Sequence, residues 1–151
     1  SSFSIKTKLV NSKEYLFDEI RKKWILSTPE EEVRQQFWKY LHFEKKYPVS
    51  LMAIEKTIVI NGLNKRFDLL IYDRNGNPNI IVECKSRNVI INESTLDQIL
   101  SYQYKIGAKY LILTNGKETY CLEIDLTEKK VIYLENILLH FYLLIPFQRN
   151  H

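Results

Sequence analysis

The chain has 151 residues, with 22 lysines and arginines against 18 aspartates and glutamates, and a formal net charge of +4. A chain of this length suits one domain with its own hydrophobic core, so we expect a single domain over residues 1–151. The contents of 45% hydrophobic and 26% charged residues are ordinary for a globular protein. The small positive surplus permits a polyanionic partner such as a nucleic acid, but does not require one.

Cysteine usage and the first residues bear on the cellular compartment. The two cysteines are Cys84 and Cys121, and no CxxC pair occurs. A disulfide framework and a zinc site are therefore not supported, and a reducing cytoplasmic location is expected. The opening stretch, SSFSIKTKLV, has no long apolar core, so it is not expected to be a signal peptide.

The longest apolar segment is ILLHFYLLIPF, at residues 137–147. It is shorter than the roughly 20 residues that span a bilayer, so no membrane contact is expected. We predict an apolar helix over 134–147. Apolar residues surround its whole circumference, so it either packs on its own domain or is also covered by a second copy or an adjoining subunit.

A first helix is predicted in the stretch STPEEEVRQQFWKYLHFEKKYP. Ser27 or Thr28 supplies the N-cap, and Pro29 suits the first turn. Three glutamates follow near the positive end of the helix dipole. Apolar residues recur at helical spacing and give the helix one apolar face; they are Val33, Phe37, Tyr40 and Leu41.

Strands are predicted on both sides of a second helix. Three of them precede it, at 54–60, 66–72 and 79–85. The helix covers 92–107, with Asn92 or Ser94 as the N-cap and Gly107 as the C-terminal stop. Further strands are expected in KYLILTNG, TYCLEIDL and KVIYLEN. This order predicts an α/β fold with a mixed sheet of about five to six strands flanked by helices.

The second and third of these strands carry charges where a buried strand would carry Val, Ile or Leu. Asn75-Gly76 is a strong signal for a two-residue hairpin turn, because both residues tolerate positive φ. With that turn at the centre, facing residues have numbers that sum to 151, so Asp68 lies opposite Glu83. The alternative is a longer loop forced by Pro78, which preserves this pairing if it lengthens symmetrically. Side chains alternate between the faces of a strand. One face then holds Arg66, Asp68, Glu83 and Lys85, and the other holds Phe67, Leu69, Ile71, Ile80, Val82 and Cys84.

Two directly opposed carboxylates would have Cβ atoms about 5 Å apart and would repel each other. A divalent cation such as Mg²⁺ removes this repulsion, because it takes hard oxygen ligands that include one or two carboxylates. Lys85, on the same face, would then orient a water molecule or neutralise charge on a phosphate. The alternative is a surface cluster in which Lys85 and Arg66 neutralise the acids. Spacing alone does not decide between the two.

Asp68, followed after the hairpin by Glu83-Cys84-Lys85, resembles the D…(D/E)xK signature of the PD-(D/E)XK nucleases. More narrowly, the chain is similar to the N-terminal nuclease domain of type I restriction enzyme R subunits and their small relatives. The resemblance covers roughly residues 28–120 and includes PEEEVRQ, RFDLLIYD, PNIIVECKS and DQILSYQYKIGAKYLILTNG, in that order. It implies a restriction-endonuclease-like core with elements in the order αβββαβ.

The resemblance also implies an activity, which is Mg²⁺-dependent endonucleolytic hydrolysis of DNA, with Mn²⁺ as a substitute metal. In such nucleases the Asp and the Glu bind the metal, and the Lys assists hydrolysis. The matching residues here are Asp68, Glu83 and Lys85. The backbone carbonyl of Cys84 is also expected to reach the metal.

Residues on the two helices complete the implied site. An acidic residue of the first helix often joins the metal site in this family; Glu31 aligns best, with Glu30 and Glu32 as alternatives. Gln98 and Tyr102 match a Gln-x-x-x-Tyr motif, and a spacing of four places them on one helical stripe, where they would contact DNA phosphates. Further DNA contacts are expected from Arg66, Arg87 and Lys105.

The best-known members of the family continue into a helicase motor, whereas no G-x-x-x-x-G-K-[ST] motif occurs in these 151 residues. The chain is therefore either a domain of a larger protein or a stand-alone relative. The alternative function is a non-catalytic DNA-binding or assembly module that keeps the nuclease fold, and action on RNA also stays open. The charged trio argues against the module, because a binding surface has no need of two repelling carboxylates.

Overall fold

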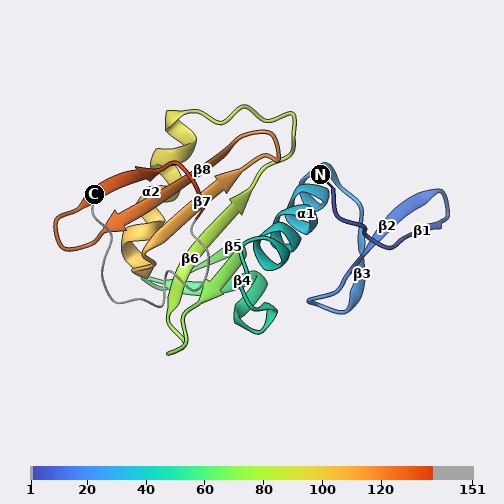
Figure 1. The fold of residues 1–151 in the computed structure, drawn as a ribbon, viewed down its shortest axis with the longest axis horizontal. Helices are drawn as coiled ribbons and strands as arrows, with labels where there is room; N and C mark the ends of the chain where they lie inside the picture. Colours follow the sequence, from blue (N-terminus) through green and yellow to red (C-terminus); the bar gives the residue numbers. More distant parts are fainter. Residues whose placement is uncertain (1, 138–151) are drawn as a thin grey trace.

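The computed structural model describes residues 2–137, apart from the side chains of residues 60 and 102. The described elements form a three-stranded sheet and a six-stranded sheet (Figure 1). In chain order they are β1 (Thr7–Val10), β2 (Lys13–Asp18), β3 (Lys23–Leu26), α1 (Pro29–Phe43), a 3₁₀ turn (Val49–Leu51), β4 (Met52–Ile60), β5 (Leu63–Tyr72), β6 (Pro78–Cys84), α2 (Glu93–Ile106), β7 (Tyr110–Thr114), β8 (Thr119–Asp125) and β9 (Lys130–Leu134).

The six-stranded sheet follows the chain, in the order β4-β5-β6-β7-β8-β9. Its neighbouring strands are antiparallel except for β6 and β7, which run parallel because α2 carries the chain back between them. The predicted mixed α/β sheet and the order of its elements, with three strands in a meander between the two helices, are confirmed.

Local signals explain where both helices begin. The hydroxyl of Thr28 accepts a hydrogen bond from the N–H of Glu31 at 3.0 Å, so Thr28 caps α1. The side-chain oxygen of Asn92 accepts from the N–H of Thr95 at 3.1 Å and caps α2 in the same way. Gly107 ends α2 with a φ of +81°, a conformation that costs a residue without a side chain little.

Both faces of the central sheet are buried. The face toward α1 packs Leu69, Ile71 and Val82 against helix residues that include Phe37 and Leu41. The face toward α2 forms a second core, made largely of Leu70, Ile81, Leu96, Ile99, Leu111 and Leu113. Burial on both faces explains why the central strands read as nearly continuous apolar runs. It also makes any charged residue within them conspicuous.

The β5–β6 hairpin keeps the predicted register on the side of the candidate site. Val82 faces Leu69 and Ile80 faces Ile71, as the predicted sum of 151 requires. The ladder then becomes irregular between Ile71 and Tyr72. The predicted register therefore holds only up to this β-bulge.

The predicted two-residue turn is wrong. Asp73 begins a longer loop, and its Oδ1 accepts hydrogen bonds from the N–H groups of Asn75 and Asn77 at 2.8 and 3.0 Å. Of the loop residues 73–77, Gly76 has the positive φ, +82°. Pro78 lacks the N–H that a ladder needs, so it stands at the first position of β6, after the loop.

The three-stranded sheet was not expected, since no element was predicted before residue 27. Its strands are antiparallel, in the order β1-β2-β3. Asn11 and Ser12 form the first turn with φ of +51° and +67°, which is the backbone of a tight hairpin. Figure 1 shows this sheet on the far side of α1 from the six-stranded sheet.

The predicted C-terminal helix does not start at residue 134. Leu134 is the last residue of β9, so no helix begins there. Residues 138–147 of that predicted helix lie outside the described residues, as does the surface that it would offer to a partner. Within residues 2–137, no helix combines the length and the apolar character needed to cross a membrane.

Candidate functional site

The candidate site lies where β5 and β6 meet the first turns of α1. Asp68 is within β5, Glu83 is the penultimate residue of β6, and Lys85 directly follows that strand. The N–H of Lys85 donates to the carbonyl oxygen of Thr114 at 2.8 Å, which continues the parallel pairing of β6 with β7. The backbone ladder thus fixes the part of the site that lies on β6.

The carboxylate of Asp68 is held from two directions. Its Oδ2 accepts a hydrogen bond from the backbone N–H of Cys84 at 2.8 Å. Its Oδ1 accepts from Nη2 of Arg34 on α1 at 3.0 Å. One donor belongs to the neighbouring strand and the other to the helix, so the position of Asp68 depends on the packing of both.

Glu83 is a buried carboxyl beside another carboxyl. It is 9% exposed, and its Oε1 has no hydrogen-bond partner among the described residues. Burial, followed by the charge of Asp68, raises the pKa of Glu83 to about 8, against the weaker opposing charges of Lys65 and Lys85. In the ligand-free chain at pH 7, Glu83 therefore favours its protonated form.

The predicted division into one charged and one apolar face is wrong at Phe67. Phe67 packs on the α2 side of the sheet, whereas Leu69 packs on the α1 side. The physical reason lies in β4, where Glu55 has a φ of +54° and its pairing with Asp68 is missing from the ladder. The predicted apolar layer is confirmed for its other members, Leu69, Ile71, Ile80, Val82 and Cys84.

Arg34 stands at the centre of a cluster of carboxylates. Its side chain is 5% exposed, and it contacts Glu31, Asp68 at 3.0 Å, Glu55 at 3.3 Å and Glu30 at 3.4 Å. Burial acts to lower the pKa of Arg34, but the carboxylates of Glu31 and Asp68 outweigh it and raise that pKa. Arg34 is therefore charged under all ordinary conditions and counterbalances the acids around it.

Glu31 is committed to this ion-pair cluster. Beyond its contact with Arg34, it accepts from Nη2 of Arg21 at 3.2 and 3.3 Å and from Nε2 of Gln35 at 3.0 Å. Both of its carboxylate oxygens are thus used by donors from the protein. The pattern of the family favours Glu31 as the first-helix acid of the site, and in the ligand-free chain its two oxygens are held by Arg21, Arg34 and Gln35.

Glu30 is the first-helix acid that faces Asp68 and Lys85. Burial and the charge of Asp68 raise the pKa of Glu30, while the charges of Arg34 and Lys85 lower it. Glu30 and Asp68 share one nitrogen, Nη2 of Arg34. The remaining alternative, Glu32, is exposed and accepts a hydrogen bond from the hydroxyl of Ser27 at 3.0 Å.

The other predicted site residues are spread over the surface. Gln98 and Lys105 are exposed on α2, and no contact within residues 2–137 joins either to the acidic pair. The side chain of Tyr102 lies outside the described part of the chain. Arg66 and Arg87 are exposed, and Nη1 of Arg87 donates to a carbonyl oxygen in the β7–β8 turn at 3.4 Å.

Sequence reasoning missed Arg21 and Glu55, which complete the cluster around Arg34. Nη1 of Arg21 lies 3.1 Å from Oε2 of Glu55, and the same guanidinium contacts Asp18. Neither residue belongs to a motif, and both reach the site through long-range packing. A buried cluster of this kind leaves no periodic signal in the sequence.

A family model described as the N terminus of type I restriction enzyme R proteins, HSDR_N, matches residues 29–137. The chain belongs to this family. The match begins at the first residue of α1 and runs through the six-stranded sheet, so it includes the acidic pair and Lys85. The three-stranded sheet precedes the matched segment.

A solved structure agrees with this HSDR_N assignment at the level of the fold. A fragment described as an HsdR subunit of a type I restriction enzyme, from Vibrio vulnificus YJ016, is similar with a TM-score of 0.53 and 21% identity. The similarity covers 72% of this chain and 23% of that chain. A DUF820 protein from Anabaena variabilis ATCC 29413, assigned as a nuclease, has a TM-score of 0.49 and 9% identity, with coverage of 90% and 80%. No curated protein has a significantly similar sequence.

Proposed function

We propose that this HSDR_N chain is a metal-dependent endonuclease that hydrolyses phosphodiester bonds of DNA. The observation that carries the proposal is the buried Glu83 carboxyl beside Asp68, with an oxygen that has no hydrogen-bond partner among the described residues. A surface ion-pair cluster fits less well, because Glu83 is buried and Lys85 forms no ion pair with any described residue. The family and the fold of the Vibrio fragment support the same reading.

The acidic pair suits Mg²⁺, with Mn²⁺ as a substitute. The unpartnered oxygen of Glu83 and the adjacent Asp68 are hard donors of the kind that this ion takes. Among residues 2–137, no group of three or more His, Cys, Asp or Glu side chains is placed to hold an ion. Mg²⁺ typically takes one or two carboxylates, and we assign the backbone carbonyl of Cys84 as a further ligand. When bound, the ion would polarise the phosphate and activate a water molecule.

The surrounding residues prepare the site for a phosphodiester. Arg34 and the N–H of Cys84 hold Asp68 in one orientation. Lys85 donates a hydrogen bond to the attacking water or to a phosphate oxygen, where negative charge builds up during the reaction. The charge of Lys85 acts on Glu30, where it lowers the pKa of the carboxyl. The proposed contacts to the DNA backbone come from exposed or helical residues, namely Arg66, Arg87, Gln98, Tyr102 and Lys105.

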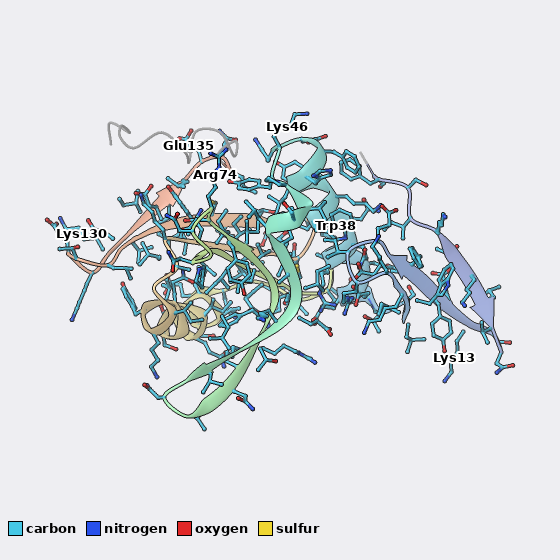
Figure 2. The ribbon with its side chains drawn as sticks, turned by 90° about the horizontal axis from the view of Figure 1, so that it is seen from below. Lys13, Trp38, Lys46, Arg74, Lys130 and Glu135 are labelled. Carbon is cyan, nitrogen blue, oxygen red and sulfur yellow. The ribbon has the colours of Figure 1, made fainter. Side chains whose placement is uncertain are left out.

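The decisive experiment is nicking of supercoiled plasmid in Mg²⁺. Asp68→Ala and Lys85→Ala are each expected to slow nicking by about a hundredfold, because each removes a group that acts in the transition state. Arg74→Ala is the control, since Arg74 is exposed in the β5–β6 loop (Figure 2) and should leave the rate within about twofold. Equal nicking by all variants would indicate a contaminant, and no nicking by the wild type would favour a non-catalytic module.

A matched pair of variants identifies the first-helix acid. Glu30→Gln is expected to slow nicking by about tenfold, because the Glu30 carboxylate lies beside Asp68 and Lys85. Glu32→Gln removes an equal charge from the same helix turn and should leave the rate within about twofold, since Glu32 contacts Ser27 instead. The two rates are measured on plasmid, with melting temperatures to confirm folding. Equal losses would mean that only the overall charge of the turn matters.

A further inference from the structure

The N-terminal segment, residues 2–26, holds most of the net charge of the chain. It contains six lysines and arginines and three acidic residues, which gives +3 of the total of +4. Two of these acids are paired, because Asp18 contacts Arg21 and Glu19 contacts Lys39 at 3.0 Å. Glu14 is the third. The excess positive charge therefore belongs to the lysines of the three-stranded sheet, outside the segment that matches HSDR_N.

The register of the sheet sorts these residues onto two faces. Leu16 and Asp18 are buried, and Thr7, Glu14 and Leu16 line a groove together with Phe37 and other residues of α1. These side chains form the inner face. Because side chains alternate along a strand, the residues between them point to the opposite, outer face. The pairings Lys8 with Tyr15 and Phe17 with Trp24 then define it. We call this the outer face; it consists of Lys6, Lys8, Val10, Lys13, Tyr15, Phe17, Trp24 and Leu26.

The lysines of the outer face rest on its aromatic rings. Nζ of Lys8 lies 4.4 Å from the centroid of the Trp24 ring, and Nζ of Lys6 lies 6.0 Å from that of Phe17. The rings of Phe17 and Trp24 meet edge to face, with centroids 5.2 Å apart. Both acids of these strands, Glu14 and Asp18, alternate onto the inner face. The outer face therefore combines ammonium groups and ring faces with no carboxylate between them.

We propose that the outer face binds single-stranded DNA. A single strand offers unpaired bases that stack on rings such as Trp24 and Phe17, and phosphates that take the lysine ammonium groups. A duplex would present phosphates alone to this face and would leave the rings unused. The choice of DNA over RNA rests on the proposed nuclease function, whereas the binding of a single strand does not.

The same sheet is joined to the candidate site by partly buried ion pairs. Arg21, in the turn between β2 and β3, reaches Glu31 at 3.2 Å and Glu55 at 3.1 Å. Arg34 contacts the same two acids and also Asp68. A strand bound on the outer face would therefore be held at a fixed position relative to the acidic pair.

The test measures binding of fluorescent oligo(dT) to the full 151-residue chain by anisotropy, in EDTA so that no cleavage occurs. Lys8→Glu with Lys13→Glu should weaken binding at least tenfold, and loss of two phosphate contacts should lower the slope of log K against log salt by about 1.4. Lys129→Glu with Lys130→Glu makes the same charge change at the other end of the molecule, as the positions of Lys13 and Lys130 in Figure 2 show. This control should bind within twofold of the wild type.

Tryptophan fluorescence supplies a separate readout of stacking. The two tryptophans are Trp24, which is 37% exposed, and Trp38, which is 2% exposed. Oligo(dT) should quench the wild type and should not quench Trp24→Phe, in which the buried Trp38 is the only tryptophan left. The proposal would be overturned if both lysine pairs weakened binding equally, or if a duplex or oligo(rU) bound more tightly than oligo(dT). It would also be overturned if oligo(dT) did not bind at all, and that result would favour a protein partner. Binding without Mg²⁺-dependent cleavage would overturn the nuclease proposal alone.

Discussion

Replacing Arg34 by methionine is expected to lower the free energy of unfolding by about 3–5 kcal/mol at pH 7. The Arg34 side chain is 5% exposed and lies among carboxylates, with contacts to Glu31 and Asp68. Methionine fills much of the same volume, so the change chiefly removes charge. Buried carboxylates left without a counter-charge must then protonate or draw in water. The loss is measured by urea denaturation, followed by circular dichroism.

Two further variants separate this electrostatic effect from lost packing. Arg74→Met removes an exposed arginine from the β5–β6 loop and should change stability by less than about 0.5 kcal/mol. Adding Asp68→Asn to Arg34→Met removes the carboxylate whose one ion pair among the described residues was with Arg34, so it should restore part of the lost stability. If the double variant is less stable than Arg34→Met, the cost comes from packing and the electrostatic account is wrong.

The parts of the fold that the sequence predicts are those with local causes. Thr28 and Asn92 cap the two helices through their own side chains, and Gly107 ends the second one. The pairing of Leu69 with Val82 follows from the spacing of the two strands about their loop, although the loop differs from the expected turn. Helix ends and hairpin registers depend on residues close in sequence, so composition and spacing predict them.

The features that the sequence did not predict depend on residues distant in sequence. Phe67 packs on the face of the sheet opposite to the expected one, because the neighbouring strand β4 is irregular at Glu55. The contact of Glu31 with Arg21 could not be predicted either, because Arg21 comes from the three-stranded sheet. That sheet has short strands of four to six residues, a length at which alternation is a weak signal.

Glu83→Gln is expected to stabilise the metal-free chain at pH 8. A carboxyl with a folded pKa of about 8, against 4.5 as its ordinary value, binds its proton more tightly in the folded state. The protonated Glu83 carboxyl therefore makes its full contribution to the free energy of unfolding below pH 4.5, and this contribution is lost as the pH rises toward 8. At about 1.4 kcal/mol per pH unit, the loss is at most about 5 kcal/mol. Glutamine keeps the neutral shape and should remove this decline, as thermal unfolding across pH 5 to 8 would show.

The same pair of proteins, with Mg²⁺ added, links this instability to the proposed ligand. A cation that binds the ionised pair competes with the proton, so Mg²⁺ should raise the melting temperature of the wild type more at pH 8 than at pH 5.5. Glu83→Gln should show little of this effect, and Glu118→Gln, at an exposed position, should behave as the wild type does. A wild type that becomes more stable from pH 5 to 8 in parallel with Glu83→Gln would contradict the raised pKa. With the expected result, the same electrostatic repulsion that destabilises the metal-free chain at pH 8 favours binding of a divalent cation to the acidic pair.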